Sequence, residues 1–281
     1  TLKSDDFITI KANWKPKSQN LLDVAHTLSL MPDSFVFVDD NPAERDLIRQ
    51  QVRNAAVPEV GDKPEGFIRA IDKMGYFEMT VVSADDAGRE KMYKENAERA
   101  KAELAFSDYR AYLLSLNMKA EIEAFIPAYH GRIAQLSNKS NQFNLTTRRY
   151  TQAEIEQIAA DESYITLYGK LADKFGDNGV VSVVIGHQTD GILDIELWIM
   201  SCRVLKRDME YAMMDRLVQE GYQRNVQNLI GHYYPTAKNG MVKEFYGSMG
   251  FTKTQEDEAG NSRWEMAVES YKAKNHVISV K

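Results

Sequence analysis

The sequence is short of cysteine, of histidine and of long apolar runs, and each shortage excludes a class of protein. Its single cysteine, Cys202, rules out an internal disulfide framework and is typical of the reducing cytoplasm. No apolar run is long enough to cross a bilayer, so we expect no membrane association. His130 and His232 lie far apart and neither has a metal-ligand spacing, so the sequence predicts no histidine-bound metal.

The charge balance excludes a further class. The net charge is −6, whereas a general nucleic-acid binder needs a basic surface to neutralise phosphates, so we expect no nucleic-acid partner. With 43% hydrophobic and 27% charged residues, the composition is that of a soluble globular protein. At 281 residues, the chain is long enough for two domains that each bury a core.

Residues 1–75 show strand and helix patterns in alternation. Three short apolar stretches are strand candidates: residues 7–10, 35–38 and 55–57. The middle stretch is apolar at every position, as expected of a parallel strand that helices cover on both faces. This order predicts an α/β fold, namely part of a parallel Rossmann-like sheet with right-handed connections.

Helix caps support this pattern. Ser18 is predicted to cap a helix that ends near residue 28. Asn41 is predicted to cap the next helix, with Pro42 in its first turn and Glu44 completing a capping box. The two helices then alternate with the strand candidates, as a β-α-β arrangement requires.

The remainder of the chain predicts a connector and a second domain. Residues 76–118 are rich in charge and predict a helical connector, with Asp85 and Asp86 near its start. Residues 119–281 predict an α+β domain, and Asn178-Gly179 is a strong signal for a hairpin turn between two of its strands.

Two adjacent carboxylates, Asp39 and Asp40, follow the all-apolar strand candidate. Ligands of open α/β sheets bind at this edge, and two carboxylates there are suited to Mg²⁺ with a phosphate in its coordination shell. The alternative is that the Asp-Asp-Asn cluster only caps the following helix. The residues alone leave both interpretations open.

A family resemblance bears on this choice. Residues 35–45 read Phe-Val-Phe-Val-Asp-Asp-Asn-Pro-Ala-Glu-Arg, and residues 13–20 read Asn-Trp-Lys-Pro-Lys-Ser-Gln-Asn. Both resemble the final motifs of haloacid-dehalogenase-type proteins of subfamily IIIC, and in particular the FkbH-like family. The resemblance continues through residues 135–150, 173–177 and 201–205, so it spans most of the chain.

The resemblance implies roles for three residues of the first domain. Asp40 would bind Mg²⁺ with Asp39 as its neighbour, and Lys17, or else Lys15, would steady the phosphate. The Asp-x-Asp-x-Thr motif that carries the family's nucleophile is missing from the sequence. We therefore expect an N-terminally truncated chain that forms no phosphoaspartate and has no phosphatase activity alone.

A second resemblance lies near the end of the chain. Asn239, Tyr246 and the pair Gly250-Phe251 are spaced as at the end of the acetyltransferase fold known as GNAT. The resemblance implies that Asn239 and Tyr246 lie near an acyl thioester, where Tyr246 can protonate the departing sulfur. The alternative interpretation is that Tyr246 and Phe251 are core residues.

The expected coenzyme A site departs from the GNAT pattern. In that fold an Arg/Gln-x-x-Gly-x-Gly loop binds the pyrophosphate, and here Lys206 and Asp208 occupy the glycine positions. We therefore expect weak or absent coenzyme A binding. The cations that remain as candidate cofactor-binding residues are Arg203 and Arg207 in this loop, and Arg148 in the polar stretch 138–149.

The FkbH-like resemblance implies a function. Members load a glyceryl unit from a phosphorylated glycerate onto an acyl carrier protein, so we expect a phosphorylated substrate and a carrier-protein partner. The GNAT-like domain would then hold a phosphopantetheine arm rather than coenzyme A. One alternative is a coenzyme A-dependent N-acetyltransferase, and another is a non-catalytic interaction module.

Overall fold

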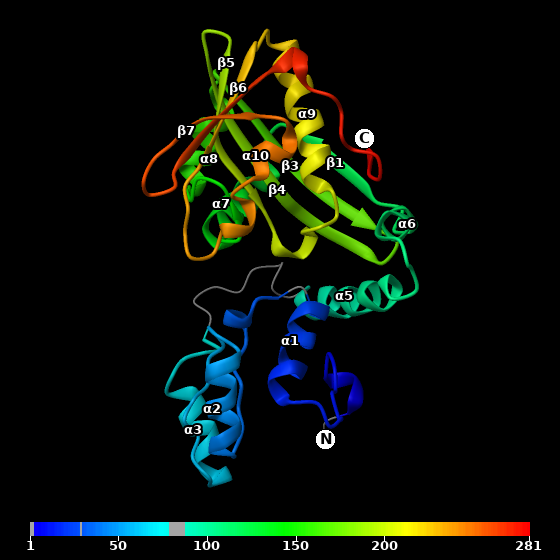
Figure 1. Ribbon diagram of the computed structural model, residues 1–281, viewed down its shortest axis with the longest axis vertical. Helices are drawn as coiled ribbons and strands as arrows, with labels where there is room; N and C mark the ends of the chain where they lie inside the picture. Colours follow the sequence, from blue (N-terminus) through cyan, green and yellow to red (C-terminus); the bar gives the residue numbers. More distant parts are fainter. Residues whose placement is uncertain (1–2, 29, 79–87) are drawn as a thin grey trace. The chain divides into compact units, whose positions relative to one another are not determined.

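The computed structural model describes residues 3–28, 30–78 and 88–281. It divides the chain into two compact units, Thr1–Ala105 and Phe106–Lys281 (Figure 1). The predicted connector is shared between them, because α5 (Arg89–Glu103) belongs to the first unit and α6 (Tyr109–Ser115) to the second. The division into domains at residues 75 and 118 stays a prediction. Asp85 and Asp86 lie outside the described residues.

The first unit is mainly helical in its described part. Besides α5, its described residues form three α-helices: α1 (Lys17–Leu28), α2 (Pro42–Gln51) and α3 (Phe67–Asp72). The cap of α2 forms as predicted, because the Asn41 side chain accepts a hydrogen bond of 3.0 Å from the Ala43 amide. The capping box does not form. The Asn41 amide donates instead to Asp39 Oδ1 at 2.9 Å, so this donor is already engaged and does not bond the Glu44 side chain.

The predicted parallel sheet of the first unit is not formed by the described residues. Pairing is limited to one parallel bridge between Val36 and Ala56. Residues 7–10 form no strand, and Phe7 and Ile10 are 48% and 64% exposed. An apolar strand is covered on both faces only when neighbouring strands build a sheet for helices to pack on. One bridge provides no such surface.

Ser18 has a different role from the one predicted. Helix α1 begins at Lys17, so Ser18 lies inside it rather than at its cap. Its hydroxyl donates a hydrogen bond of 2.6 Å to the side chain of Gln51. Ser18 therefore links α1 to the end of α2.

The second unit is built on a nine-stranded mixed sheet, which confirms the predicted α+β architecture. The strand order is β7-β8-β6-β5-β4-β3-β1-β9, and β2 pairs with β5. The strands are β1 (Lys119–Glu123), β2 (Phe143–Asn144), β3 (Tyr164–Asp173), β4 (Gly176–Thr189), β5 (Ile192–Met200), β6 (Asn228–Tyr233), β7 (Thr252–Glu256), β8 (Ser262–Ala267) and β9 (Ser279–Val280).

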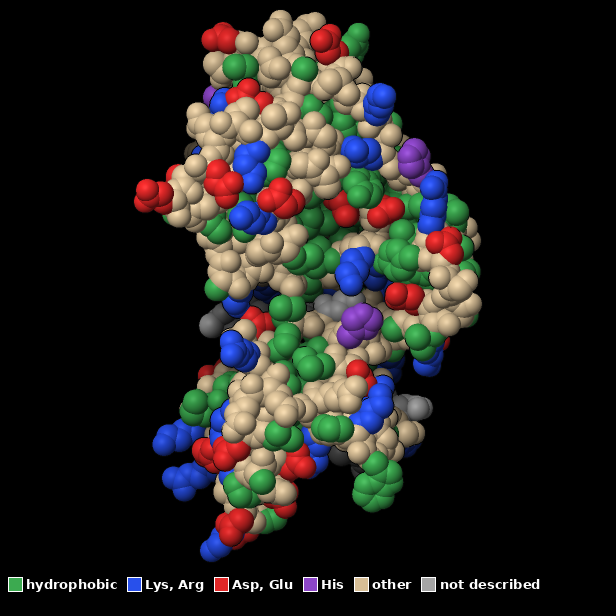
Figure 2. Space-filling model, in the orientation of Figure 1, with side chains coloured by type: hydrophobic (Ala, Val, Ile, Leu, Met, Phe, Trp, Pro, Cys, Tyr) green, Lys and Arg blue, Asp and Glu red, His purple; other side chains and the backbone are tan. Residues whose placement is uncertain are grey.

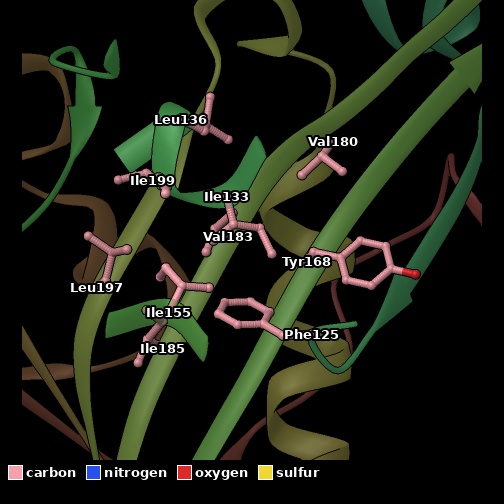
Figure 3. Packing of buried hydrophobic residues seen from close by; sticks show 11 residues of the cluster. Phe125, Ile133, Leu136, Ile155, Tyr168, Val180, Val183, Ile185, Leu197 and Ile199 are labelled. Carbon is pink, nitrogen blue, oxygen red and sulfur yellow. The ribbon is translucent and has the colours of Figure 1, made fainter. Parts of the chain in front are cut away.

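Helices pack on both faces of this sheet (Figure 1). The helices are α7 (His130–Lys139), α8 (Gln152–Ala160), α9 (Met209–Gln223) and α10 (Phe245–Met249). Helices α7 and α8 bury one face around residues such as Ile133, Ile155 and Leu197 (Figure 3). On the other face α9 approaches closely at Gly169, where a β-carbon would lie 2.4 Å from Met209. Among the described residues, no helix is both long and apolar enough to cross a membrane.

The hairpin between β3 and β4 turns earlier than predicted. Asp173 pairs with Gly176, so the two turn residues are Lys174 and Phe175. Asn178 is instead buried beside an irregularity in the β3–β4 register, and its side chain donates to the Leu171 carbonyl at 3.2 Å. The buried hydrogen bond, rather than a turn, accounts for the asparagine.

Candidate functional site

Strands β5 and β6 separate partway along their length. They are parallel neighbours from Ile192–Asn228 to Ile195–Gly231, and beyond this point their pairing stops. A bulge in the β4–β5 register leaves Glu196 opposite no residue of β4, which bends β5 at the same level. We call the opening beyond Ile195 and Gly231 the fork.

Residues 143–146, the fork segment, fill the fork. Strand β4 occupies one edge of β5, so β2 must lie on the edge that β6 has left. The Leu145 amide donates to the Trp198 carbonyl of β5 at 3.2 Å, and the Tyr234 amide donates to the Leu145 carbonyl at 2.8 Å. The fork segment therefore connects the two separated strands by main-chain hydrogen bonds.

Asn239, a predicted catalytic residue, lies at the fork with its side chain fully buried. Its amide nitrogen donates to the carbonyls of Asn144 and Tyr234, both at 2.9 Å. Its amide oxygen accepts from the Thr236 amide at 2.7 Å. Because the side chain is satisfied on both ends, Asn239 anchors the fork segment in this conformation.

Tyr246, the other predicted residue of this pair, lies at the base of the fork. A β-carbon at Gly231 would lie 2.4 Å from the Tyr246 ring, so the glycine leaves the space that the ring fills. The hydroxyl is buried and forms no well-aligned hydrogen bond with a described residue, although the His232 amide lies close to it. Burial raises the pKa of Tyr246 far above its usual value, so the hydroxyl stays protonated.

Polar side chains lie on the opposite face of the sheet at this level. Successive residues of a strand face opposite sides, so His232 points away from the face that Gly231 offers to Tyr246. Its Nε2 lies 3.1 Å from the Asp194 carboxylate of β5. Both side chains are partly exposed, at 21% for His232 and 44% for Asp194. This pair could orient an imidazole as a base beside the fork.

Arg148, a predicted cofactor-binding residue, pairs with a carboxylate at the bulge. Its guanidinium lies 2.5 Å from the Glu196 carboxylate, and the Tyr150 hydroxyl lies 3.4 Å from the same group. Arg148 is thus on the polar side of the fork. Sequence reasoning did not single out Asp194 or Glu196, because acidic residues on a strand are common on solvated faces.

The loop before α9 has the backbone conformation of a glycine-rich loop, although Lys206 and Asp208 stand at the glycine positions. Lys206 and Asp208 have φ values of 66° and 60°, in the left-handed region that favours glycine. The Tyr109 hydroxyl donates to the Lys206 carbonyl at 2.6 Å. Arg203 Nε donates to Ser201 Oγ at 3.1 Å, whereas Arg207 is buried 3.3 Å from a fully buried Asp173 carboxylate.

Two carboxylates lie where a phosphate would meet the start of α9. Asp208 stands at the N-cap position of this helix, although its side chain makes no capping hydrogen bond, and Glu210 lies in the first turn. Burial raises the pKa of both groups, and that of Glu210 reaches about 7. A helix N-terminus attracts anions, but here the chain's own acids already occupy that position. Together with Arg207, which is paired with Asp173, these acids disfavour a pyrophosphate at this loop, and the weak coenzyme A binding stays a prediction.

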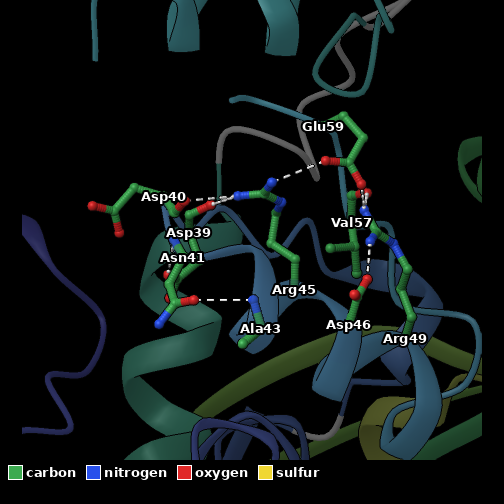
Figure 4. A network of polar contacts seen from close by, with 9 residues as sticks. All are labelled: Asp39, Asp40, Asn41, Ala43, Arg45, Asp46, Arg49, Val57 and Glu59. Carbon is green, nitrogen blue, oxygen red and sulfur yellow. Dashed lines mark hydrogen bonds and ion pairs between the residues drawn. The ribbon is translucent and has the colours of Figure 1, made fainter. Parts of the chain in front are cut away.

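In the first unit the structure brings Lys17 and Asp39 together. Lys17 Nζ lies 2.5 Å from Asp39 Oδ2, although the two residues are far apart in sequence. Burial acts to raise the pKa of Asp39, but the Lys17 ammonium and the Asn41 amide outweigh it and hold the pKa below its usual value. Arg45 donates to the main-chain carbonyls of Asp39 and Asp40, each at 2.9 Å (Figure 4).

The same residues fit Mg²⁺ poorly. Asp39 is engaged by Lys17, and the exposed Asp40 side chain points away from the Arg45 network (Figure 4). Within the described ranges, no three His, Cys, Asp or Glu side chains gather as metal ligands. On the face shown in Figure 2, basic and acidic side chains are interspersed over each unit. The predicted Mg²⁺ role of Asp40 stays a prediction.

Comparison with known proteins gives similarity in fold only. No family model and no curated protein matches the sequence. Three solved structures that are similar are the ribosomal-protein-S18-alanine N-acetyltransferase of Escherichia coli, Ard1 of Thermoplasma volcanium, and the spermidine N-acetyltransferase of Vibrio cholerae in complex with CoA and spermine.

These likenesses are distant. The first is 11% identical, covering 56% of this chain and 99% of that one, with a TM-score of 0.41. The second is 18% identical, covering 53% of this chain and 97% of that one, with a TM-score of 0.41. The third is 11% identical, covering 54% of this chain and 98% of that one, with a TM-score of 0.42. No comparison shows the FkbH-like or haloacid-dehalogenase-type part that the motifs indicate. The geometry of the fork and the Lys17–Asp39 contact are therefore the observations that bear on function.

Proposed function

We propose that the second unit transfers an acyl group from a thioester to an amine, in the manner of a GNAT-type acyltransferase. The observation that carries this proposal is the Tyr246 hydroxyl, buried at the fork without a well-aligned hydrogen bond. A buried hydroxyl without a partner destabilises a protein by about 1–3 kcal/mol. A ligand group that completes the hydrogen bond explains why such a hydroxyl is placed there.

The residues on the two faces of the sheet have complementary roles in this reaction. His232, oriented by Asp194, accepts the proton of the amine as nitrogen attacks the thioester carbonyl. The carbon–sulfur bond then breaks, and the Tyr246 hydroxyl donates a hydrogen bond to the departing thiolate. Because its pKa is raised, Tyr246 remains a donor over the whole working pH range.

The acyl donor is proposed to be a phosphopantetheine arm on an acyl carrier protein. Asp208 and Glu210 at the start of α9 oppose binding of the pyrophosphate of coenzyme A. A phosphopantetheine arm has the same thioester end but lacks the adenosine phosphates. The loop therefore supports a carrier-bound donor over free acetyl-coenzyme A.

The Tyr246→Phe variant tests the proposed reaction. The full chain is assayed for acyl transfer from S-acetyl-pantetheine and from acetyl-coenzyme A to a panel of amines. We expect transfer from S-acetyl-pantetheine, and a fall in kcat of roughly 100-fold in the variant, typical of losing a positioned donor. Tyr168→Phe is the matched control, since Tyr168 is equally buried but its hydroxyl bonds Glu121 away from the fork.

Two results would reject this proposal. One is the absence of transfer from either thioester to any amine. The other is transfer that Tyr246→Phe leaves unchanged. A chain that binds a carrier protein without transfer would instead indicate the non-catalytic interaction module.

A second candidate function concerns the first unit. The contact between Lys17 and Asp39, at the end of the stretch bridged to Ala56, supports a site for a phosphorylated compound such as a phosphorylated glycerate. We propose that this unit contributes to FkbH-like loading of a carrier protein but has no phosphatase activity alone. Mg²⁺-dependent hydrolysis of an aryl phosphate by the purified chain, lost in Asp40→Asn, would contradict that expectation.

A further inference from the structure

We infer that four exposed cations around the fork form a docking surface for an acidic carrier protein. These residues, the basic patch, are Lys139, Arg148, Arg149 and Lys238. The inference rests on the proposed function for the thioester that the carrier bears. It goes further by assigning the part of the second unit that binds the carrier's own protein surface.

Two long segments of the sequence contain no acidic residue. The chain as a whole has 41 acidic residues among 281, yet residues 124–153 and 221–243 have none. Both segments carry lysine and arginine, so each is positively charged although the net charge of the chain is −6. Positive charge is therefore concentrated in these two parts of the chain.

The fold brings the two acid-free segments together at the fork. The Tyr234 amide donates to the Leu145 carbonyl at 2.8 Å, and the Asn239 side chain donates to the Asn144 carbonyl at 2.9 Å. Lys238 directly precedes this asparagine. Cations that are far apart in sequence thus lie on adjoining loops.

Lys139 and Arg149 lie together at the end of α7. Lys139 is the last residue of this helix. The Arg149 guanidinium donates to the carbonyl of Ser137 at 2.6 Å and to that of Ser140 at 3.4 Å, on either side of Lys139 in the sequence. These contacts hold two positive charges close to each other beside the fork segment.

The basic patch is accessible to a partner. Arg148 pairs with Glu196, but the Arg148 side chain is 49% exposed and that of Glu196 only 19%. Two large apolar side chains of the second acid-free segment, Tyr234 and Met241, are 38% and 56% exposed. Tyrosine, methionine and arginine are enriched at protein interfaces, so this mixture favours a protein partner.

An acidic protein is the partner that this distribution of charge selects. The net charge of −6 repels an acidic partner from the surface as a whole, whereas the basic patch attracts and orients it. The same net charge disfavours nucleic acid, whose binding needs extensive phosphate neutralisation. A carrier docked on the patch has its arm beside the fork, where the proposed acyl transfer takes place.

Two double variants of equal net charge test the inference. Lys139→Glu with Lys238→Glu reverses two charges of the patch. Lys119→Glu with Lys272→Glu is the matched control, because both lysines are exposed and lie away from the fork. Lys119 is on β1, which β3 and β4 separate from β5, and Lys272 follows Val268, which bonds Gln227 before β6 begins.

The probe is the acidic acyl carrier protein of bacterial fatty-acid synthesis, titrated by calorimetry into the full chain at low salt. It is used with an acetyl-phosphopantetheine arm and without any arm. We expect the patch variant to bind both forms roughly tenfold more weakly, the effect of losing and reversing two surface charge pairs. The control should change by less than about twofold, because distant exposed charges are screened.

Transfer from S-acetyl-pantetheine separates this inference from the proposed function. The patch variant should keep the wild-type rate with this small donor, because only the carrier contacts the patch. Carrier binding that the patch variant weakens, in a chain without any acyl transfer, would leave the inference standing and reject the proposed function. Transfer from the acetylated carrier that both double variants perform equally well would do the reverse.

Three further results would overturn the inference. One is no binding of either carrier form to the wild type. Another is an equal loss of affinity in both double variants, which would show that net charge rather than the patch matters. The third is an RNA duplex that binds as tightly as the carrier and is lost in the same variant. If the patch variant does not fold, Lys139→Gln and Lys238→Gln take its place, each with an expected loss of about twofold to fivefold.

Discussion

Replacing Lys206 by glycine should stabilise the second unit. Lys206 has a φ of 66° in the loop before α9, and its side chain is exposed. A non-glycine residue in the left-handed region is destabilised by roughly 1–2 kcal/mol. Glycine removes this strain but gives the unfolded chain more freedom, which offsets about 0.5–1 kcal/mol of the gain. The net expectation is about 0.5–1 kcal/mol of added stability.

Lys206→Ala is the control that isolates the backbone effect. It removes the same side chain but keeps the β-carbon, so it keeps the strain. For a unit of this size, the expected gain of Lys206→Gly over Lys206→Ala corresponds to a rise in Tm of about 1–4 °C. Urea denaturation of the two variants gives the same difference as a free energy.

Tryptophan fluorescence makes this assay specific for the second unit. Trp198 and Trp264 are buried there, at 0% and 4% exposure, so their emission changes when that unit unfolds. Trp14, in the first unit, is fully exposed at 104% and changes little. Equal stability of Lys206→Gly and Lys206→Ala would show that residue 206 does not hold a left-handed conformation, and the comparison with a glycine loop would fail.

Two further stability measurements follow from buried groups at the same sites. The pKa of Glu210 is raised to about 7 in the folded chain from the ordinary 4.5. As the pH rises from about 4.5 to about 7, the unfolded chain releases this proton before the folded chain does, so the stability of the wild type should fall over that range. Glu210→Gln should lack this loss, which urea denaturation at pH 5 and pH 8 would detect; a constant difference between the two proteins would contradict it. Tyr246→Phe should leave stability unchanged or slightly higher, whereas Tyr168→Phe should lower it by about 1 kcal/mol, because only Tyr168 loses a hydrogen bond. Equal losses in thermal unfolding would mean that the Tyr246 hydroxyl has a partner.

Local signals in the sequence predicted several elements correctly. Asn41 and Pro42 marked the start of α2 because a cap depends only on neighbouring residues. Helix α8 was missed although Thr151 and Glu154 form a complete capping box, a signal that could have been found. Features that depend only on neighbouring residues, such as helix caps, can thus be predicted from the sequence.

Long-range pairing was not predictable in the same way. The stretch 35–38 has the composition of a buried strand, yet it forms a single bridge, because burial depends on neighbouring strands that composition does not specify. Strand β2 has two residues and hence no periodicity to detect.

The candidate site shows the same difference between local signals and long-range contacts. Asn239 and Tyr246 were found through their spacing, and the structure places both at the fork. Their interpretation changed, because the bonds of Asn239 to the fork segment come from distant parts of the chain. His232 was considered in the sequence only as a metal ligand, and its pairing with Asp194 depends on the parallel register of β5 and β6.

Gly231 has a consequence for how the Tyr246 hydroxyl is positioned. Even a methyl group at residue 231 would come within 2.4 Å of the Tyr246 ring, closer than atoms approach without movement. The absence of a side chain at Gly231 of β6 therefore determines where the Tyr246 ring can lie. Substituting alanine there would shift the tyrosine while preserving its chemistry, and so separate the effect of where the hydroxyl lies from the effect of having one.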